Sequence, residues 1–506
     1  MKQIRFILLL FFFYSCGFDE GKEEIIQLKE ATALEQEAVT NAYTTKNIKS
    51  FGAKGDGKTN DQAAFEKAAV YFNNRGGNGR LIIPKGTYLV GKQIFSKGLA
   101  GQPAYKGLDV LYFNNVKNLT ISGEEGARLK YASGLRFGAF DPVTGKAFNH
   151  PPGYFVNYSY AAFIGHCIHF VNCNNIKVEG IEIDGNNKSF KYGGTYGDTG
   201  RQLPHYGIFI RDSRQVVITN MNVHHTALDG ISLANAFKDK ALDQVEISNS
   251  KFEYNSRQGF SWIGGNGLKV KKCSFNHTGK AAFASAPGAG IDIEAEVGPI
   301  SNGNFEECEL INNTGCGLVA DSGESSNCTF TKCTFWGATN WSVWVHKPNF
   351  TFIKCNIYGS FVHGFDALDN KSATKFYSCN FEDKAYNGKA PFGNFLVETN
   401  NKKRLLFDNC RFTANKQKLV WAEQPSFWKS EEKFQFMKCH FIVKNAHYPQ
   451  GDWVALIRGI RYKDCIFQFL HPDAKQKGYW LNDCCHKPMN DDLGGNKILY
   501  ASEKPG

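Results

Sequence analysis

A short pattern of apolar and small residues recurs along most of the chain. Nearly every copy has apolar residues at its first, third and eighth positions, and a small or sulfur-containing residue at its sixth. Alternation of apolar residues with other residues is typical of a β-strand that buries one face. The copies are VEISNSKF (245–252), LKVKKCSF (268–275), CTFTKCTF (328–335), FTFIKCNI (350–357), TKFYSCNF (374–381), LLFDNCRF (405–412), FQFMKCHF (434–441) and IRYKDCIF (460–467).

The sixth positions form a series that begins at Ser250 and continues almost entirely with cysteine. Successive members are 22 to 35 residues apart, and they are Cys273, Cys308, Cys333, Cys355, Cys379, Cys410, Cys439 and Cys465. A repeat that combines a near-constant segment with a variable number of further residues indicates stacked coils. Each coil needs the same strands, whereas its loops can lengthen freely.

The cysteines of this series come singly, without the paired spacing of zinc sites. We therefore expect one inward column of reduced thiols that pack as small hydrophobic groups. A serine in the column is expected to cost about 1–3 kcal/mol by burying a hydroxyl without a partner. Only Cys484, Cys485 and His486 form a local cluster, for which a disulfide or plain packing is expected.

A second alternating strand follows many of these copies, and it opens with Gly or Ser. Every second side chain of such a strand points away from the core. The segments are GIFIRD (207–212), GISLAN (230–235), GFSWIG (259–264), GIDIEAE (290–296), GLVADS (317–322), SVWVHK (342–347) and GFDALD (364–369).

The N-terminal part combines FGAKGDGKTND (51–61), a helical pattern with Phe65 and Phe72 on its apolar face, and RLIIPKGTYLV (80–90). These segments resemble the N-terminal signature of the pectate-lyase-like superfamily. The resemblance covers residues 48–470 with the repeats, and it implies an all-β, single-domain, right-handed parallel β-helix whose open end is capped by the helix. It does not specify the reaction, because lyases, hydrolases, epimerases and phage tailspikes share the fold.

The ends of the chain predict the remaining organisation. Lys2, Arg5, the apolar run from Phe6 to Tyr14 and then Ser15 and Cys16 have the layout of a secretory signal that is too short to span a bilayer. Ser15-Cys16 resembles a bacterial lipobox, so we expect a signal peptide over 1–15 and lipidation of Cys16. The expected product is anchored to the bacterial outer membrane, at the cell surface or in the periplasm, with plain secretion as the alternative.

A polar, flexible tether is predicted over 16–47, and a C-terminal cap or tail over 471–506. The formal net charge of +11 suits an acidic partner. No basic run or known nucleic-acid motif is present. We expect a monomer that binds an acidic polysaccharide or oligosaccharide, does not bind nucleic acid, and meets a membrane only through its anchor.

Aligning the second strands places Glu294, Asp321 and His346 in one outward column on successive coils. Asp292 and Trp344 stand two residues earlier, Glu296 two residues later, and Lys347 next to His346. Four carboxylates this close together repel unless a cation or protons offset them. One interpretation is that Asp292, Glu294, Glu296 and Asp321 bind calcium. A second is that two of the acids form an acid and base pair for glycoside hydrolysis, and a third is that they form a solvated acidic stripe without a function.

A second column lies in the turn before these strands and contains His225, Tyr254 and His277, with Arg257 beside them. His and Tyr are common proton-transfer groups, although each alone is more often a capping or ladder residue. The aromatic insertions 131–162 and 186–207 flank the same coils and suit the walls of a groove. His205 and Arg211 are further candidates for substrate binding.

These columns favour a carbon–oxygen lyase that acts by β-elimination on a uronate-containing glycan, either as a polysaccharide lyase or as a dehydratase of a terminal uronate. His225 would take the proton, Tyr254 would protonate the leaving oxygen, and Arg257 or calcium would neutralise the uronate carboxylate. Glu294, Asp321, His346 and Lys347 would hold the sugar.

Two alternatives stay open: a glycoside hydrolase using two of Asp292, Glu294 and Asp321, and a non-catalytic glycan-binding protein. The Asp pair of polygalacturonase-like hydrolases is missing, and Leu228-Asp229-Gly230 only loosely resembles their Asn-Thr-Asp triplet, which lowers the hydrolase reading.

Overall fold

The computed structural model describes residues 42–97, 103–149, 160–196, 200–399, 403–422, 429–444, 459–471 and 490–501. The chain divides into two units, Met1–Asn41 and Ala42–Gly506, and every described residue belongs to the second. The predicted signal peptide, Cys16 and the Cys484–His486 cluster lie outside the described residues. No helix within the described ranges is long and apolar enough to cross a membrane.

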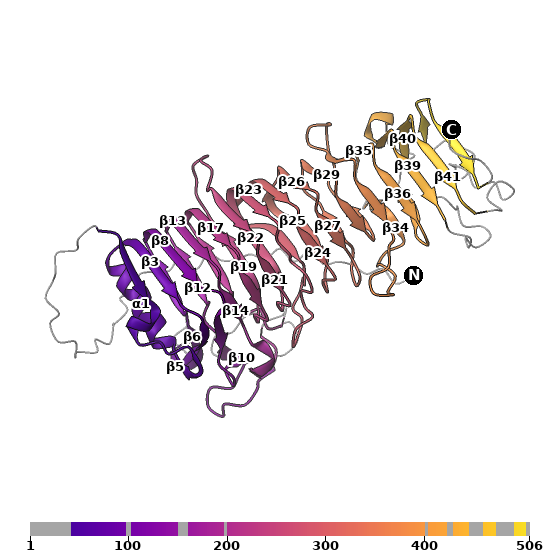
Figure 1. Ribbon diagram of the computed structural model, residues 1–506. Helices are drawn as coiled ribbons and strands as arrows, with labels where there is room; N and C mark the ends of the chain where they lie inside the picture. Colours follow the sequence, from indigo (N-terminus) through magenta and orange to yellow (C-terminus); the bar gives the residue numbers. More distant parts are fainter. Residues whose placement is uncertain are drawn as a thin grey trace. The chain divides into compact units, whose positions relative to one another are not determined.

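The second unit is a right-handed parallel β-helix whose coils follow one another in sequence order from α1 (Gln62–Asn74) (Figure 1). A typical coil contributes one strand to each of three stacks, and neighbouring coils pair in parallel. The first stack contains β7 (Leu111–Asn114), β12 (Ile168–Val171), β16 (Ile208–Arg211), β19 (Asp229–Ala234), the first parts of β22 (Gln258–Lys271) and β23 (Ile291–Glu306), β25 (Leu318–Ser325), β28 (Val343–Val345), β31 (Phe361–His363), β34 (Phe395–Thr399) and β37 (Lys418–Trp421).

The second stack continues from the first through β22 and β23, which run through both. It also contains β1 (Thr44–Asn47), β3 (Gly77–Ile83), β8 (Lys117–Gly123), β13 (Asn174–Glu179), β17 (Arg214–Thr219), β20 (Val245–Ser248), β26 (Cys328–Thr331), β29 (Phe350–Ile353), β32 (Thr374–Tyr377), β35 (Leu405–Asp408), β38 (Phe434–Met437), β40 (Ile460–Lys463) and β42 (Asp491–Asp492).

The third stack faces the other two across the core. It contains β2 (Asp56–Asn60), β4 (Gly86–Val90), β9 (Ala127–Tyr131), β14 (Glu182–Asp184), β18 (Asn222–His224), β21 (Lys251–Glu253), β24 (Glu309–Ile311), β27 (Thr334–Trp336), β30 (Asn356–Tyr358), β33 (Asn380–Glu382), β36 (Arg411–Ala414), β39 (His440–Val443), β41 (Ile466–Phe469) and β43 (Lys497–Tyr500). Outside the stacks, β5 (Lys92–Lys97), β6 (Pro103–Leu108), β10 (Arg136–Ala139), β11 (Ala161–Ala162) and β15 (Lys191–Tyr192) form a small separate sheet.

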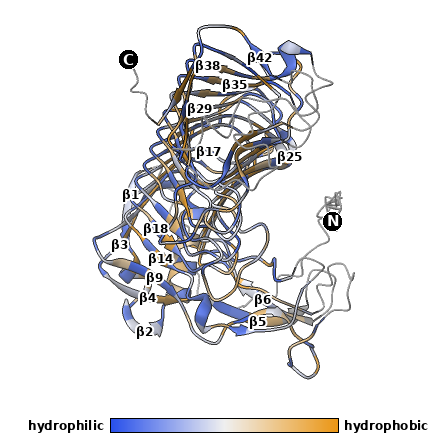
Figure 2. Cartoon of the chain, turned by 90° about the vertical axis from the view of Figure 1, so that its right-hand side faces the viewer, coloured by the Kyte–Doolittle hydropathy of each residue, from blue (hydrophilic) through white to orange (hydrophobic). Residues whose placement is uncertain are grey.

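The core consists of rows of identical or similar side chains, one from each coil. In one row, adjacent phenylalanine rings stack with centroids 4.4 to 5.2 Å apart, and its members are Phe305, Phe330, Phe352, Phe376, Phe407 and Phe436. This spacing matches the ~4.8 Å between paired strands, so backbone pairing and ring stacking reinforce each other. In Figure 2, where the coils are seen from one end, hydrophobic and hydrophilic residues share the same strands, as expected when one side of each strand faces the core.

The predicted cysteine column is confirmed: its eight cysteines are free and buried. Their thiols lie against backbone carbonyls two residues earlier, as in Cys355 Sγ to Ile353 O at 3.5 Å. Ser250 occupies the same column and donates to Ser248 O at 2.7 Å, while its hydroxyl accepts the Met221 N–H at 3.0 Å. A serine in the column therefore has partners, and the expectation of an unpartnered hydroxyl is wrong.

The cap helix is confirmed as α1, which buries Phe65 and Phe72. Paired strands continue beyond the predicted bounds 48–470 at both ends. β1 pairs with β3 inside the predicted tether, and β43 pairs with β41 inside the predicted tail. Each added strand covers the backbone groups of a coil that would otherwise be an open edge. The strand expected over 364–369 is instead β31, which ends at His363.

We predict that Cys355→Ser changes the free energy of unfolding by no more than about 1 kcal/mol, because the new hydroxyl can use the Ile353 carbonyl. Cys355→Leu should cost about 1–3 kcal/mol, because the coils above and below leave no space for a larger side chain. Chemical unfolding of both variants measures this. Ready labelling of Cys333, Cys355 and Cys379 by a thiol reagent in the native protein would contradict the buried column.

Candidate active site

One outward row of the first stack contains His169, Asp292 and Trp344. We call it the site row. In-register strand pairing aligns its members, which are Tyr112, His169, Phe209, Ser232, Ser261, Asp292, Val319, Trp344, Val362, Glu398 and Trp421. Aromatic residues stand at both ends of the row, and the polar residues Ser232, Ser261 and Asp292 between them are buried.

The predicted acids lie in or beside the site row, but not in the predicted register. Asp292, Glu294 and Glu296 follow one another on β23, and Asp321 is on β25. The pairing of β23 with β25 shifts after Ile293, so that Glu294 lies opposite Ser322 and not opposite Asp321. A β-bulge of this kind adds one residue to one strand and redirects the side chains that follow.

The acids nevertheless interact. Burial raises the pKa of Glu294 to about 7, and the negative charges of Glu296 and Asp321 add to this shift. Burial, followed by the charges of Glu294 and Asp321, raises the pKa of Asp292 well above its usual range. Gln258 Nε2 donates to Asp292 Oδ2, while Asp292 Oδ1 has no hydrogen-bond partner within the described part of the chain. The cluster therefore holds protons at neutral pH.

The four acids are not a preformed metal site among the described residues. The groups of three or more potential ligands whose atoms lie within 4.8 Å of one another are found elsewhere in the chain. Calcium binding by Asp292, Glu294, Glu296 and Asp321 stays a prediction, and any bound cation would need ligands from the substrate as well.

An ion pair lies beside the acids at the start of β19 and β22. Arg257 Nε and Nη2 donate to Asp229 Oδ1 and Oδ2 at 2.8 and 2.5 Å, and the Asp229 side chain is fully buried. Arg257 also lies next to the Tyr206 phenol, whose pKa burial raises to about 12 despite that positive charge. Arg257 is thus held between Asp229 and Tyr206. Its positive charge partly offsets the rise that burial causes in the pKa of Glu294 and Glu296.

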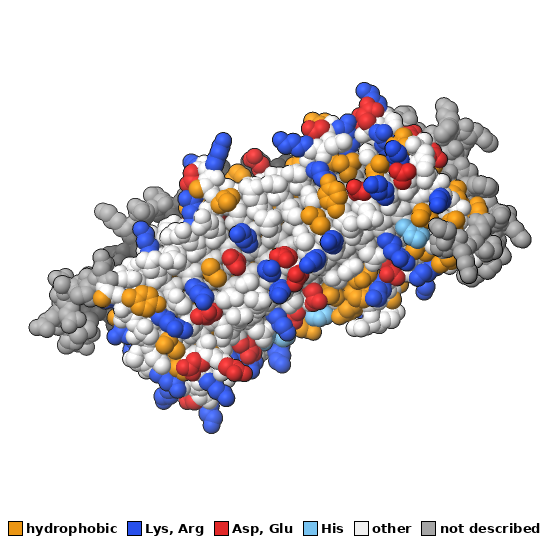
Figure 3. All heavy atoms as spheres, turned by 45° about the horizontal axis from the view of Figure 1, so that its top comes forward, with side chains coloured by type: hydrophobic (Ala, Val, Ile, Leu, Met, Phe, Trp, Pro, Cys, Tyr) orange, Lys and Arg blue, Asp and Glu red, His pale blue; other side chains and the backbone are white. Residues whose placement is uncertain are grey.

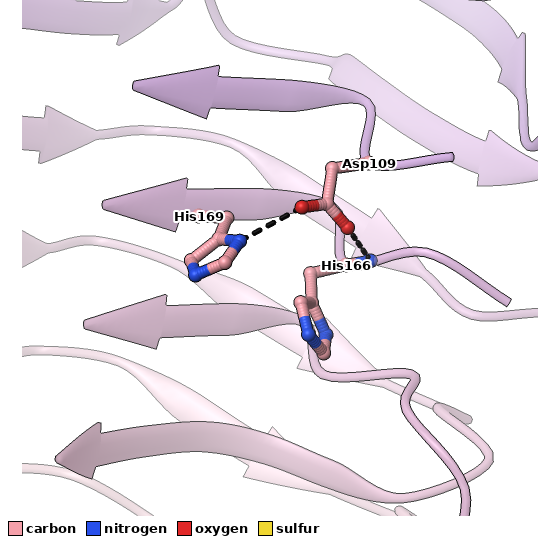
Figure 4. Close-up of side chains that lie close together, drawn as sticks. All are labelled: Asp109, His166 and His169. Carbon is pink, nitrogen blue, oxygen red and sulfur yellow. Dashed lines mark hydrogen bonds and ion pairs between the residues drawn. The ribbon is translucent and has the colours of Figure 1, made fainter. Parts of the chain in front are cut away.

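The N-terminal end of the site row contains a carboxylate and two histidines, shown in Figure 4. Asp109 Oδ2 lies 2.8 Å from His169 Nδ1, and Asp109 Oδ1 accepts the backbone N–H of His166 at 2.7 Å. Burial opposes ionisation of Asp109, but His166 and His169 together hold its pKa below the usual value. His169 Nδ1 therefore donates to a carboxylate, and its proton-accepting nitrogen is Nε2.

His169 Nε2 is buried and has no hydrogen-bond partner among the residues that the structure describes. His166 is different: its Nδ1 accepts the Tyr206 backbone N–H at 3.1 Å, and burial lowers its pKa to about 4. The rings of His166 and Tyr206 stack with centroids 4.7 Å apart. His169, His166 and Tyr206 consequently form one contact network that reaches Arg257.

The predicted column of His225, Tyr254 and His277 is present in the structure, but it is separate from the acid cluster. His225, Tyr254 and His277 adopt the same left-handed backbone conformation (φ 54° to 59°), and their rings stack at 5.5 and 4.7 Å in a turn after the third stack. Besides burial, the groups that shift the pKa of His225 are His224, Asp184, Lys188 and Arg128. None of these groups belongs to the acid cluster.

Of the residues that were predicted to contact the sugar, some lie beside the acids and others do not. His346 stacks on Trp344 with centroids 4.4 Å apart, and Lys347 lies beside Asp321, so these three residues accompany the acids. His205 is fully buried, accepts the Ala227 N–H at 2.8 Å, and has its pKa lowered by burial to about 3. Arg211 is exposed and pairs with Asp212 at 3.5 Å.

Asp109, His166, His169 and Tyr206 were missed from the sequence. His169 lies on β12, Asp109 and His166 lie just before β7 and β12, and Tyr206 lies just before β16. The long insertions between 131 and 207 interrupt the spacing that would have aligned β7 and β12 with GIFIRD. The signal that could have found them is the apolar alternation of LYF (111–113) and IHF (168–170). In the structure, Ile168 and Phe170 pair with Ile208 and Ile210 on one side and with Leu111 and Phe113 on the other.

We predict that the stability of the protein falls as the pH rises from about 4.5 to 7, in part because Glu294 is protonated in the folded state and ionised in the unfolded state over this window. Glu294→Gln removes this contribution. The variant should match the wild type near pH 4 and exceed its apparent Tm by about 2 °C or more at pH 8. Thermal scans at one fixed rate measure this, with the exposed Glu309→Gln as the control. Equal apparent Tm values at pH 8 would contradict the assigned protonation.

The comparisons agree with this architecture. The family model described as "Right handed beta helix region" matches residues 166–347, which include His169, Arg257 and the acids. No curated protein matches the chain in sequence. The N-terminal fragment of gene product 12 of bacteriophage Phi29 is 12% identical with a TM-score of 0.52, over 90% of this chain and 72% of that one.

Two further solved structures match more loosely. The A-module of mannuronan C-5 epimerase AlgE4 from Azotobacter vinelandii is 11% identical with a TM-score of 0.36, over 91% of this chain and 96% of that one. ORF18 of Geobacillus virus E2 is 15% identical with a TM-score of 0.34, over 73% of this chain, which spans 61% of the length of ORF18. Carbohydrate-active enzymes and phage proteins thus both occur among the neighbours. The chain has a right-handed parallel β-helix fold.

Proposed function

We propose that this protein is a carbon–oxygen lyase that acts by β-elimination on a uronate-containing glycan bound along the site row. The observation that supports this most is His169, whose Nδ1 is committed to Asp109 and whose Nε2 is free to accept a proton. Elimination needs such a base for the C5 proton of the uronate. The negative charge of Asp109 stabilises the imidazolium that forms, and it keeps the ring oriented.

Tyr206 and Arg257 supply the other two requirements of the reaction. Tyr206 keeps its proton at neutral pH, because burial raises its pKa to about 12, so it can protonate the departing C4 oxygen. Arg257 lies beside the phenol and can stabilise both the resulting phenolate and the uronate carboxylate. Asp229 fixes the guanidinium in place through two hydrogen bonds. His169 and Tyr206 therefore replace His225 and Tyr254 in the proposed mechanism.

The acid cluster suits a neighbouring part of the same glycan. Asp292 holds its proton at neutral pH and Glu294, with a pKa of about 7, is partly protonated, so both can donate hydrogen bonds to sugar oxygens and repel a second uronate less than ionised carboxylates would. Trp344 offers an aromatic face next to them. The positive formal charge of the chain is not gathered into one patch on the face in Figure 3, where basic and acidic side chains are interspersed. Local groups, and not a broad basic surface, would thus select the glycan.

A glycoside hydrolase is the second candidate, and the acid cluster favours it. Glu294, with a pKa of about 7, has the properties of a general acid. Burial raises the pKa of Asp321, while Lys347 and Trp344 beside it partly offset that rise by favouring the ionised form that a base or nucleophile requires. In that reaction His169 would contribute only to binding. A non-catalytic glycan-binding protein is the third candidate.

The deciding experiment follows the ultraviolet absorbance of a new C4–C5 double bond over a panel of pectin, alginate and ulvan oligosaccharides. We predict that the wild type generates this absorbance, and that His169→Ala and Tyr206→Phe each reduce turnover at least ~100-fold. Tyr254→Phe is the matched control, because its ring stacks with His225 and His277 away from the site row, and it should keep its activity. New reducing ends without the absorbance, abolished by Glu294→Gln but not by His169→Ala, would replace the lyase with the hydrolase.

A further inference from the structure

A second group of ligand-type side chains lies on the third stack, whereas the site row lies on the first. Asp184 ends β14 and stands directly opposite His224 at the end of the neighbouring strand β18. His225 follows His224. One ligand atom from each of these three residues lies within 4.8 Å of the others. Two adjacent coils thus bring a carboxylate and two imidazoles together.

The two imidazoles approach each other through the same type of nitrogen. His224 Nδ1 and His225 Nδ1 are 2.7 Å apart, and Asp184 Oδ1 is 3.8 Å from His224 Nδ1. The two nitrogens can share one proton in a hydrogen bond, or both can direct their lone pairs to one cation. The latter arrangement needs both protons to move to the Nε2 atoms.

The surroundings favour that arrangement for His224. Its Nε2 lies 3.1 Å from Glu182 Oε1, and an ionised carboxylate only accepts hydrogen bonds, so the His224 proton belongs on Nε2. Nδ1 is then the lone-pair nitrogen. A carboxylate that orients the far nitrogen of a ligating histidine is the usual second layer of protein metal sites.

Arg128 holds both carboxylates of the cluster. Its Nη2 donates to Asp184 Oδ2 at 2.6 Å, and its Nε lies 3.1 Å from Glu182 Oε1. Asp184 therefore keeps Oδ1 directed at the histidines, although Oδ1 also accepts the Asn186 N–H at 2.9 Å. With two carboxylates and one guanidinium, the group carries one net negative charge before any cation binds.

His225 needs only a change of tautomer to act as the second nitrogen ligand. His225 Nδ1 already lies 2.7 Å from His224 Nδ1. Moving its single proton from Nδ1 to Nε2 frees the lone pair that faces His224 Nδ1. Its ring stacks on Tyr254, which holds it in position.

We propose that Asp184, His224 and His225 bind a divalent transition metal ion of the Zn²⁺ type through two imidazole Nδ1 atoms and one carboxylate oxygen. Two imidazoles and a carboxylate suit zinc, copper and nickel better than calcium or magnesium, which prefer oxygen ligands. The ion joins the coils of β14 and β18. It fixes His225 at one end of the ring stack that continues through Tyr254 to His277.

The group at Asp109 is a weaker candidate for a metal, although its ligand atoms also lie within 4.8 Å of one another. His166 Nδ1 already accepts the Tyr206 N–H, so its proton is on Nε2 and neither nitrogen offers a lone pair. His169 Nδ1 donates to Asp109. Of these two groups among the described residues, the third-stack group alone has two imidazole nitrogens that can converge on one ion.

The experiment titrates the full chain, stripped with a chelator and then dialysed, with Zn²⁺ in a calorimeter and with Co²⁺ by visible absorbance. We predict one site per chain, a rise in apparent Tm on adding Zn²⁺, and loss of the site in His224→Ala and His225→Ala. Glu182→Gln should weaken binding by about 10- to 100-fold, because it removes only the group that orients His224. This variant keeps the test valid if either alanine variant fails to fold.

Two control variants identify the source of the signal. His277→Ala alters the same ring stack without removing a proposed ligand, and His169→Ala alters the other cluster, so both should bind Zn²⁺ as the wild type does. No binding by the wild type would overturn the proposal. So would wild-type affinity in the His224→Ala and Glu182→Gln variants, or loss of binding in His169→Ala alone. None of these outcomes depends on whether the protein is a lyase.

Discussion

The in-register parallel pairing of successive coils is the constraint on which the rest of this structure depends. It sets a repeat of ~4.8 Å along the stack and places equivalent residues of each coil in rows. Inside, the rows become stacked phenylalanine rings and a column of thiols. Outside, they become the site row, in which His169, Asp292 and Trp344 align although they are far apart in sequence.

The same constraint explains which parts of the fold were predictable. The cysteine series and the alternating strands report directly on the repeat, so the β-helix, its cap helix and the buried column followed from the sequence. Register between particular coils did not follow. The bulge after Ile293 shifts Glu294 away from Asp321, and no residue type marks it, because a bulge depends on how two neighbouring strands settle against each other.

The site was harder to predict for a related reason. Spacing gives the position of a residue along its coil, but not which side chains reach each other across a turn. His225 and Arg257 lie in the same turn of successive coils, yet Arg257 extends to Asp229 while His225 contacts His224 and Tyr254. The fully buried Thr226 and Ala227 lie between the two environments. His169 was hidden by the insertions that precede β16, not by unusual chemistry.

Along the first stack, the pKa values of neighbouring carboxyl groups are shifted in opposite directions. Asp109 is held in its ionised form by two histidines, whereas burial and neighbouring carboxylates raise the pKa of Asp292 and Glu294. Environments that push pKa values apart allow one surface to accept a proton at one point and to donate one at another. Tyr206 and Arg257 lie between these two regions.

The alternation of strands and turns also determines how the chain can change in length. One extra residue inside a strand of the first stack would exchange its inward and outward side chains and would remove a member from both a core row and the site row. The same residue added to a turn would only lengthen a loop, as the unequal spacing of the cysteines already indicates. Tolerance to insertion should therefore vary along the sequence with the period of the coils, and new loops can arise in the turns while the rows remain intact.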